Sequence, residues 1–196
     1  GQASFNYSLS GSGVPTAGKS LVLDGINDYV NLGSITTNGE ITIEAWVKPA
    51  NLSANNLKAH IFDLGNGQSN HNIVLELDRF TAYVGSSVVN SPINIPQNLL
   101  VIDSWIHLAA TIKNNLASVY VNGILTSVNG YNTSLTQGDG SFIAPDIVMT
   151  RTSNFIGKSN WSTDPYFKGQ IADARIYDKA RTWSEIQQDM AGYVDI

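Results

Sequence analysis

The chain contains no cysteine among its 196 residues, which excludes disulfide bridges and thiolate metal sites. Such a chain is compatible with a reducing cytoplasm and equally with a bacterial secreted protein that has a sufficient core. Its length suits one domain with a sizeable core better than two.

No apolar run approaches the roughly 18 residues that a membrane-spanning helix needs, and no charged-then-apolar leader opens the chain. We therefore expect no membrane insertion. The Ser/Gly-rich segment from Ser8 to Gly13 is typical of a linker. We expect residues 1–18 to be a linker or edge segment and residues 19–196 to be one domain. The whole would be a monomeric module of a larger exported bacterial protein, secreted or at the cell surface.

Charged side chains are also scarce, at 14% of the residues, against about 25% in ordinary soluble domains. The net charge of -5, without a basic stripe, argues against nucleic acid as a partner. Asn, Ser, Thr and Gly take the place of the missing charges, and their polar groups can face water or the hydroxyls of a sugar. Twelve of the 16 acidic residues are aspartate, which suits turns and, less specifically, oxygen-ligated cations.

Short segments of alternating apolar and polar residues predict β-strands along most of the chain. In residues 41–47 the isoleucines, alanine and valine alternate strictly with other residues. The other expected strands are 20–24, 28–33, 60–64, 72–78, 80–84, 105–112, 117–121 and 166–178, and residues 129–153 are expected to form a long polar connection.

Two local signals complete the predicted fold. Asn122-Gly123 indicates a hairpin, because a type I′ turn needs positive φ at both central residues. Thr182 and Glu185 have the spacing of a capping box, which predicts a short C-terminal helix. Strands at short, regular spacing followed by one helix predict an all-β fold of two antiparallel sheets packed face to face.

Six segments occur in an order that resembles the laminin-G-like and pentraxin-like (concanavalin A-like) jelly rolls. They are 21–30, 41–49, 105–109, 119–123, 155–157 and the closing strand 171–177. The resemblance covers about residues 20–190 and implies a two-sheet jelly-roll sandwich. Members of this group bind sugars, mediate adhesion or act as spacers, and sister branches cleave glycans, so the fold leaves the function open.

The residues do not favour an enzyme. Glycan hydrolases on a related sandwich carry alternating acids that flank one bond, about 5 Å apart in the retaining case. The nearest match, Glu76-Leu77-Asp78, is followed by Phe80 and Thr81 instead of a second glutamate, so we interpret Glu76 as a solvated residue. The three histidines are scattered, and neither a phosphate loop nor a nucleophile elbow is present. A degenerate hydrolase would require a carboxylate pair that meets across strands.

The resemblance implies two kinds of calcium site. The two-ion site of the pentraxins does not carry over, because among His71, Asn72 and residues 159–161 only Asn72 keeps the residue type. A single structural calcium, common in the wider family, would have Asp173, Asp24 and Asn27 as ligands. Alternatively, Asp24 caps its own turn and Asp173 binds neighbouring backbone N–H groups.

The tryptophans indicate where a ligand would bind. Trp46, Trp105 and Trp183 are expected to pack, whereas Trp161 lies in a turn-rich polar loop. An aromatic ring can stack on a pyranose while polar neighbours bind its hydroxyls, and the alternative is a loop anchor. The expected binding residues are Trp161, Asn160, Asp164 and Tyr166, together with Asn70, His71 and Asn72 from a second loop.

The sequence thus predicts a non-catalytic, lectin-like carbohydrate-binding module that binds glycan at the rim of the sandwich. The second hypothesis is an adhesion or spacer domain with a cell-surface protein as its partner.

Overall fold

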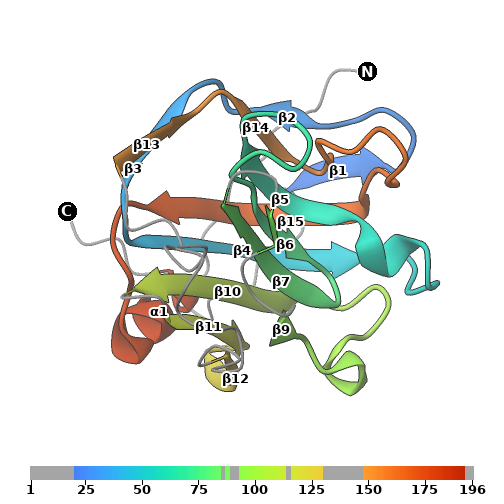
Figure 1. The fold of residues 1–196 in the computed structure, drawn as a ribbon. Helices are drawn as coiled ribbons and strands as arrows, with labels where there is room; N and C mark the ends of the chain where they lie inside the picture. The colour runs from blue at the N-terminus through green and yellow to red at the C-terminus, as the bar shows by residue number, and fades with distance from the viewer. Residues whose placement is uncertain (1–19, 85–86, 89–92, 114–115, 130–147, 193–196) are drawn as a thin grey trace.

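The computed structural model describes residues 20–84, 87–88, 93–113, 116–129 and 148–192. Two large antiparallel sheets face each other, and one short helix follows the last strand (Figure 1). This is the jelly-roll sandwich that the sequence predicts. The expected linker at 1–18 and residues 130–147 of the expected connection lie outside the described residues.

The first sheet has six strands. In spatial order they are β1 (Leu21–Asp24), β15 (Lys168–Tyr177), β4 (Ile41–Pro49), β10 (Ile106–Lys113), β11 (Leu116–Val121) and β12 (Ile124–Asn129). The closing strand β15 therefore lies beside β1 and β4, in the interior of this sheet (Figure 1).

The second sheet has seven strands. They are β2 (Val30–Asn31), β14 (Ser153–Ile156), β5 (His60–Gly65), β6 (Ile73–Glu76), β7 (Arg79–Val84) and β8 (Ser87–Val88), with β9 (Ile93–Asn94) also paired to β7. Strands β3 (Ile35–Asn38) and β13 (Val148–Arg151) form a separate pair, and two 3₁₀ turns cover Asn56–Lys58 and Gln97–Leu99.

The core lies between the two sheets and follows from the period-two alternation of side chains. Ile41, Ile43, Ala45 and Val47 of β4 are completely buried and belong to one continuous apolar cluster with residues of both sheets. Each large aliphatic side chain removed from water contributes about 1.5–3 kcal/mol. The apolar residues of the alternating strands thus pack together in one shared core.

The hairpin prediction is confirmed, because Asn122 and Gly123 have φ values of 50° and 71°. The polar connection expected at 129–153 is shorter, since β13 and part of β14 lie within it. Among the tryptophans expected to pack, Trp46 is buried, but Trp183 is 55% exposed and donates its ring N–H to the Gly123 carbonyl at 2.7 Å.

The helix α1 (Trp183–Met190) begins at the predicted capping box, in which Thr182 and Glu185 each accept the other's backbone N–H. Its Ile186 is fully buried in a small cluster with Ala109 and Tyr120 of the first sheet. Among the described residues no helix is long and apolar enough to cross a membrane.

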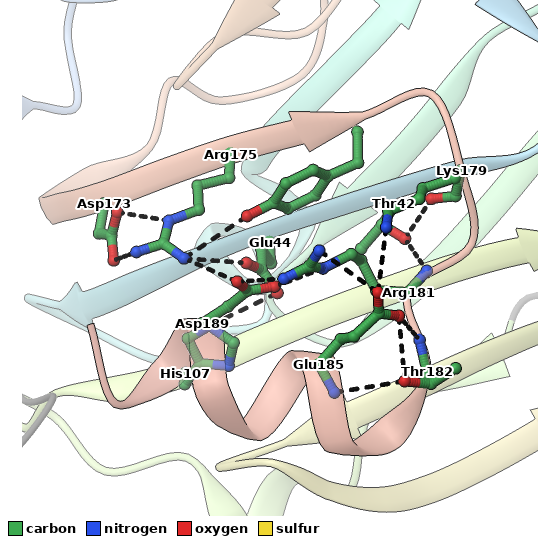
Figure 2. Close-up of polar contacts among 11 residues, drawn as sticks. Thr42, Glu44, His107, Asp173, Arg175, Lys179, Arg181, Thr182, Glu185 and Asp189 are labelled. Carbon is green, nitrogen blue, oxygen red and sulfur yellow. Dashed lines mark hydrogen bonds and ion pairs between the residues drawn. The ribbon is translucent and has the colours of Figure 1, made fainter. Parts of the chain in front are cut away.

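A charged network fixes this helix to the sheet (Figure 2). Asp189 of α1 accepts a hydrogen bond from Nε of Arg181 at 2.7 Å and lies 3.1 Å from Nη1 of Arg175. Beneath them Glu44 of β4 is completely buried. Nη1 of Arg175 lies 3.8 Å from Glu44, and Nε2 of His107 lies 4.0 Å from it. Neither oxygen of Glu44 has a hydrogen-bond partner among the described residues.

Burial and the neighbouring Asp189 raise the pKa of Glu44 to about 8. Burial likewise lowers the pKa of His107 to about 3, with Arg175 adding to the effect, so His107 is neutral and supplies no countercharge. The network therefore contains a carboxyl group that is more stable in its protonated form.

We predict that Glu44→Gln makes the protein more resistant to alkaline conditions. Because the pKa of Glu44 is higher in the folded chain than in the unfolded chain, the folded state holds the extra proton, and stability falls as pH rises from about 4.5 to about 8. Glutamine abolishes this loss. At pH 9 the variant should exceed the parent in free energy of unfolding by at least about 1.4 kcal/mol, the equivalent of one pKa unit.

Urea unfolding at pH 5 and pH 9 measures this effect. Glu40→Gln is the matched control, because Glu40 pairs with Lys113 at 3.0 Å and its pKa is lowered by that hydrogen bond. At pH 9, Glu40→Gln should show no gain in free energy of unfolding over the parent. An equal difference between Glu44→Gln and the parent at both pH values would contradict the prediction.

Candidate functional site

A cavity of about 200 Å³ lies on the outer face of the second sheet. Its lining residues are His60, Val74, Glu76, Thr81, Tyr83, Trp161 and Asp164. Strand β7 shows why the sheet contributes these side chains, since Phe80 and Ala82 enter the core and the alternating Thr81 and Tyr83 face outward. The register pairs Val74 of β6 with Thr81, so both strands present side chains to the same cavity.

A bulge in β5 brings His60 to this face. His60 pairs with Glu76, but Phe62 pairs with the adjacent Leu75, so β5 has one extra residue at this point. Ile61 and Phe62 both belong to the core cluster. His60 and Asp63 can therefore contact each other on the outer face, although regular alternation would place residues three apart on opposite faces.

The Asp63 carboxylate connects the sheet to the loop above it. Asp63 is completely buried. Its Oδ1 accepts a hydrogen bond from Nδ2 of Asn72 at 2.8 Å, and its Oδ2 accepts from the backbone N–H of Asn160 at 2.7 Å. His60 Nδ1 lies 3.1 Å from the same Oδ2. One carboxylate thus holds three separate segments of the chain.

The loop between β14 and β15 forms the other wall of the cavity. Ser159 Oγ donates to Asp164 Oδ2 at 2.8 Å and accepts the backbone N–H of Trp161 at 2.9 Å. The half-buried Trp161 ring packs against the rings of His60 and Tyr83, with centroids 5.9 and 5.3 Å away. The loop therefore holds an aromatic ring over the sheet and leaves part of it exposed.

The charge of the cavity is centred on His60. Its Nε2 lies 3.4 Å from Glu76 Oε1 and 3.4 Å from Asp164 Oδ2. Burial alone would lower the pKa of His60, but hydrogen bonds to Asp164, Asp63 and Glu76 outweigh burial and hold its pKa well above its ordinary value. His60 is therefore an imidazolium at neutral pH.

The two carboxyl groups beside His60 differ in their environments. The contact with His60 lowers the pKa of Asp164. Burial raises the pKa of Glu76, and His60 and Arg79 oppose that rise. Glu76 also lies 2.9 Å from Nε of Arg79 and is only 14% exposed, which corrects its interpretation as a solvated residue.

The structure places the predicted binding residues in different environments. Trp161 and Asp164 line the cavity. The Asn160 side chain donates to the Ser153 carbonyl at 3.0 Å, and Tyr166 packs 6.2 Å from Tyr29, away from the cavity lining.

The second predicted loop does not line the cavity and is connected to it through Asn72 and Asp63. Asn72 is fully buried, with its Oδ1 accepting the Asn70 N–H at 2.7 Å. The His71 carbonyl accepts a hydrogen bond from Arg151 at 2.7 Å. The predicted composite rim is thus a pocket on the face of the sheet, and the Asn72 side chain helps to position it through Asp63.

Sequence reasoning missed five lining residues, namely His60, Val74, Glu76, Thr81 and Tyr83. The close spacing of the expected strands 72–78 and 80–84 was a usable signal, because a tight connection between them sets the register that pairs Val74 with Thr81. The bulge that turns His60 outward has no comparable signature in the residues around it.

The residues expected to bind calcium do not form one site. Asp24 Oδ1 accepts the backbone N–H groups of Ile26 at 2.7 Å and Asn27 at 3.3 Å, so Asp24 caps its own turn. Asp173 receives two hydrogen bonds from Arg175, both 2.7 Å long.

The strand register also separates the two aspartates. Asp24 pairs with Lys168, and the five residues from there to Asp173 span about 16 Å of strand. The three residues therefore do not fit a single calcium ion. Within the described ranges, no group of three or more His, Asp or Glu side chains is placed to hold a metal ion.

Residues 24–187 match the family described as the concanavalin A-like lectin/glucanases superfamily. The chain belongs to this superfamily. No curated protein matches it significantly in sequence. The superfamily assignment agrees with the resemblance seen in the order of the sequence segments.

Solved structures with the same fold come from several kinds of protein. Domain 4 of AbnA, an extracellular GH43 arabinanase from Geobacillus stearothermophilus solved with arabinotriose, is 20% identical, with a TM-score of 0.61 over 97% of this chain and 82% of that one. A heptameric SAP-like pentraxin from Limulus polyphemus is 16% identical, with a TM-score of 0.60 over 86% and 80%. A Trypanosoma rangeli sialidase is 14% identical, with a TM-score of 0.60 over 96% and 32%. At these identities the likeness shows the fold.

We predict that the three histidines differ sharply in charge. At pH 7.5 His60 should be protonated. His71 should be neutral, because burial and Arg151 lower its pKa, and His107 should be neutral for the reasons given above. Nitrogen-detected NMR of the imidazole rings measures this directly. A titration midpoint for His60 at or below about 6.5 would contradict the prediction.

His60→Gln should destabilise the protein by about 3 kcal/mol at pH 6, because it leaves buried carboxylates without their cation. The pKa of His60 is raised on folding, so its contribution is complete below about pH 6.5 and declines as pH rises through the folded value. The loss should therefore shrink in alkaline solution. His71→Gln, measured by the same urea unfolding, is the control and should lack this dependence.

Proposed function

We propose that this chain is a non-catalytic carbohydrate-binding module whose cavity receives one sugar unit. The observation that carries the proposal is the combination of a partly exposed Trp161 ring and the side chains of Tyr83, Thr81, Glu76 and Asp164 around one cavity. Aromatic rings stack on the apolar face of a pyranose, and carboxylates and hydroxyls bind the sugar hydroxyl groups.

The size of the cavity supports recognition of a single unit. Its volume of about 200 Å³ is below the roughly 300–1,000 Å³ of sites that enclose drug-sized ligands. Further units of a glycan would extend into solvent over the exposed Ser162 and Thr163.

The arrangement of the carboxylates favours binding over hydrolysis. Glu76 lies at the end of β6, and Asp164 lies in the loop between β14 and β15. A degenerate hydrolase would require such a pair of carboxylates from separate segments of the chain. However, both contact the same Nε2 atom of His60 at 3.4 Å. The imidazolium occupies the space between them, whereas a glycosidase places the scissile bond there.

The comparisons support a sugar ligand at the level of the superfamily. Its description names lectins as well as glucanases, and the arabinanase domain with this fold was solved with arabinotriose. As part of the same proposal, the module belongs to a larger exported protein.

A protein-binding adhesion domain is the second candidate. The observation in its favour is the segment that begins at the last residue of the second 3₁₀ turn, where Leu99, Val101 and Ile102 are 37%, 54% and 49% exposed. Exposed apolar side chains close together favour a protein contact. A module of this kind would not require Trp161.

We predict that Trp161→Ala weakens glycan binding at least tenfold, which corresponds to about 1.4 kcal/mol, because it removes the stacking surface. A glycan array identifies the ligand, and calorimetry measures the change in affinity. Stability should fall by only about 0.5–1.5 kcal/mol, since the ring contacts to Tyr83 and His60 are lost.

Trp183→Ala is the matched control, because Trp183 is exposed on α1 and does not line the cavity. Its affinity should equal that of the parent. A chelator should leave glycan binding unchanged, since Asp24, Asn27 and Asp173 do not form one site. Incubation with the glycan should release no new reducing ends, because the module does not cleave it. Array signal that survives Trp161→Ala would refute this site, and cleavage of the bound glycan would refute the absence of catalysis.

A further inference from the structure

The side chains around the cavity carry more negative than positive charge. Asp63, Glu76 and Asp164 all contact the single imidazolium of His60. Arg79 lies beside Glu76 but also donates two hydrogen bonds to Asp78, at 2.8 and 2.9 Å. Lys58 is the other nearby cation, and it contributes to lowering the pKa of Asp164. These side chains comprise four carboxylates and three cations.

The cavity also has too few hydrogen-bond donors to satisfy the carboxylate oxygens of Glu76 and Asp164. Nε2 of His60 has one proton, and two carboxylates share it at 3.4 Å each, compared with about 2.7–2.9 Å for an ordinary charge-assisted hydrogen bond. Oε2 of Glu76 is buried and makes no hydrogen bond among the described residues, because Nε of Arg79, 2.9 Å away, donates its proton to Asp78. Asp164 keeps 28% of its side chain exposed. This wall of the cavity can therefore accept a further cationic donor.

The aromatic side chains of the cavity suit the same kind of group. The rings of Trp161 and Tyr83 lie 5.3 Å apart at an interplanar angle of 46°. The face of an aromatic ring attracts a cation, more strongly when the cation is desolvated. An ammonium group combines a compact positive charge with three donors.

We propose that the cavity selects a sugar unit with a free amine, that is, an amino sugar that is not acetylated. The ring of the sugar stacks on Trp161, and its ammonium group lies against Asp164 and Glu76. This inference rests on the proposed function and narrows it to one class of glycan. An N-acetyl group removes the charge and adds volume, and a neutral hydroxyl supplies one donor without charge.

Two other cationic ligands fit the observations less well. A divalent metal ion needs several ligand atoms around one point, and within the described residues no suitable group of three is present. The side chain of a lysine offers the same ammonium group but no ring for Trp161. A lysine peptide therefore serves as a comparison in the test.

The experiment measures calorimetric affinities for three matched β-1,4-linked oligomers, made of glucosamine, N-acetylglucosamine or glucose. The corresponding galactose-series ligands are tested in the same way, together with a trilysine peptide. At pH 5.5 and low salt, we expect the amine form of at least one series to bind at least tenfold tighter than its acetylated and neutral counterparts. This advantage should decrease with added salt and as the amine loses its proton.

Each outcome separates this inference from the proposed function. If an acetylated or neutral sugar binds through Trp161 as tightly as the amine form, the inference fails and the proposed function stands. If no sugar binds, both fail. If trilysine binds as tightly as the amine form, the charge alone is recognised, and the assignment to an amino sugar is overturned in favour of a protein partner.

Asp164→Asn should reduce the preference for the amine form to less than about threefold, because it removes one of the two accessible negative charges. Glu76→Gln provides a second test in case the loss of the Ser159 contact disturbs the loop. Asp178→Asn is the matched control, since Asp178 is exposed beyond β15 and does not line the cavity. It should keep the full preference. Circular dichroism and thermal unfolding verify that each variant is folded.

Discussion

The completely buried carboxylate of Asp63 is the interaction on which the candidate site depends. It accepts hydrogen bonds from Asn72, which immediately precedes β6, and from the backbone of Asn160 in the loop between β14 and β15, and it orients His60 within the sheet. A buried carboxylate is expensive unless its oxygens are satisfied. The loop that carries Trp161 therefore helps to stabilise the buried Asp63 carboxylate, through the backbone N–H of Asn160.

Two buried clusters of charged residues, around His60 and around Glu44, differ in how fully their carboxyl groups are compensated by cations and hydrogen bonds. The carboxylates around His60 have a cation in direct contact, and their hydrogen bonds outweigh burial and raise the pKa of His60. Glu44 beneath α1 lies 3.8 Å from Arg175 but has no hydrogen-bond partner in the described part of the chain. The first cluster positions side chains around a cavity. The second fixes the helix through Asp189 and tolerates a carboxyl group that favours its neutral form.

Local patterns in the sequence account for most of the fold. The alternation in residues 41–47, the Asn122-Gly123 turn and the Thr182 capping box each depend on neighbouring residues, so each is visible without the structure. Trp161 was also identifiable, as an aromatic residue in a polar loop. The remainder of the site depends on a strand bulge beside His60 and on the inward orientation of Asn72, both of which arise from tertiary packing.

The hydrogen bond between Asp63 and Asn160 joins residues 97 positions apart. Contacts of such sequence separation form only after the intervening chain has been ordered, because the entropy of loop closure must be overcome first. The same cost opposes the pairing of β5 with β14, in which Asp63 lies opposite Phe155, so the cavity should be completed only once these distant strands have paired. For the same reason, the loop can open locally while both sheets stay intact, so a molecule can be folded and yet not competent to bind.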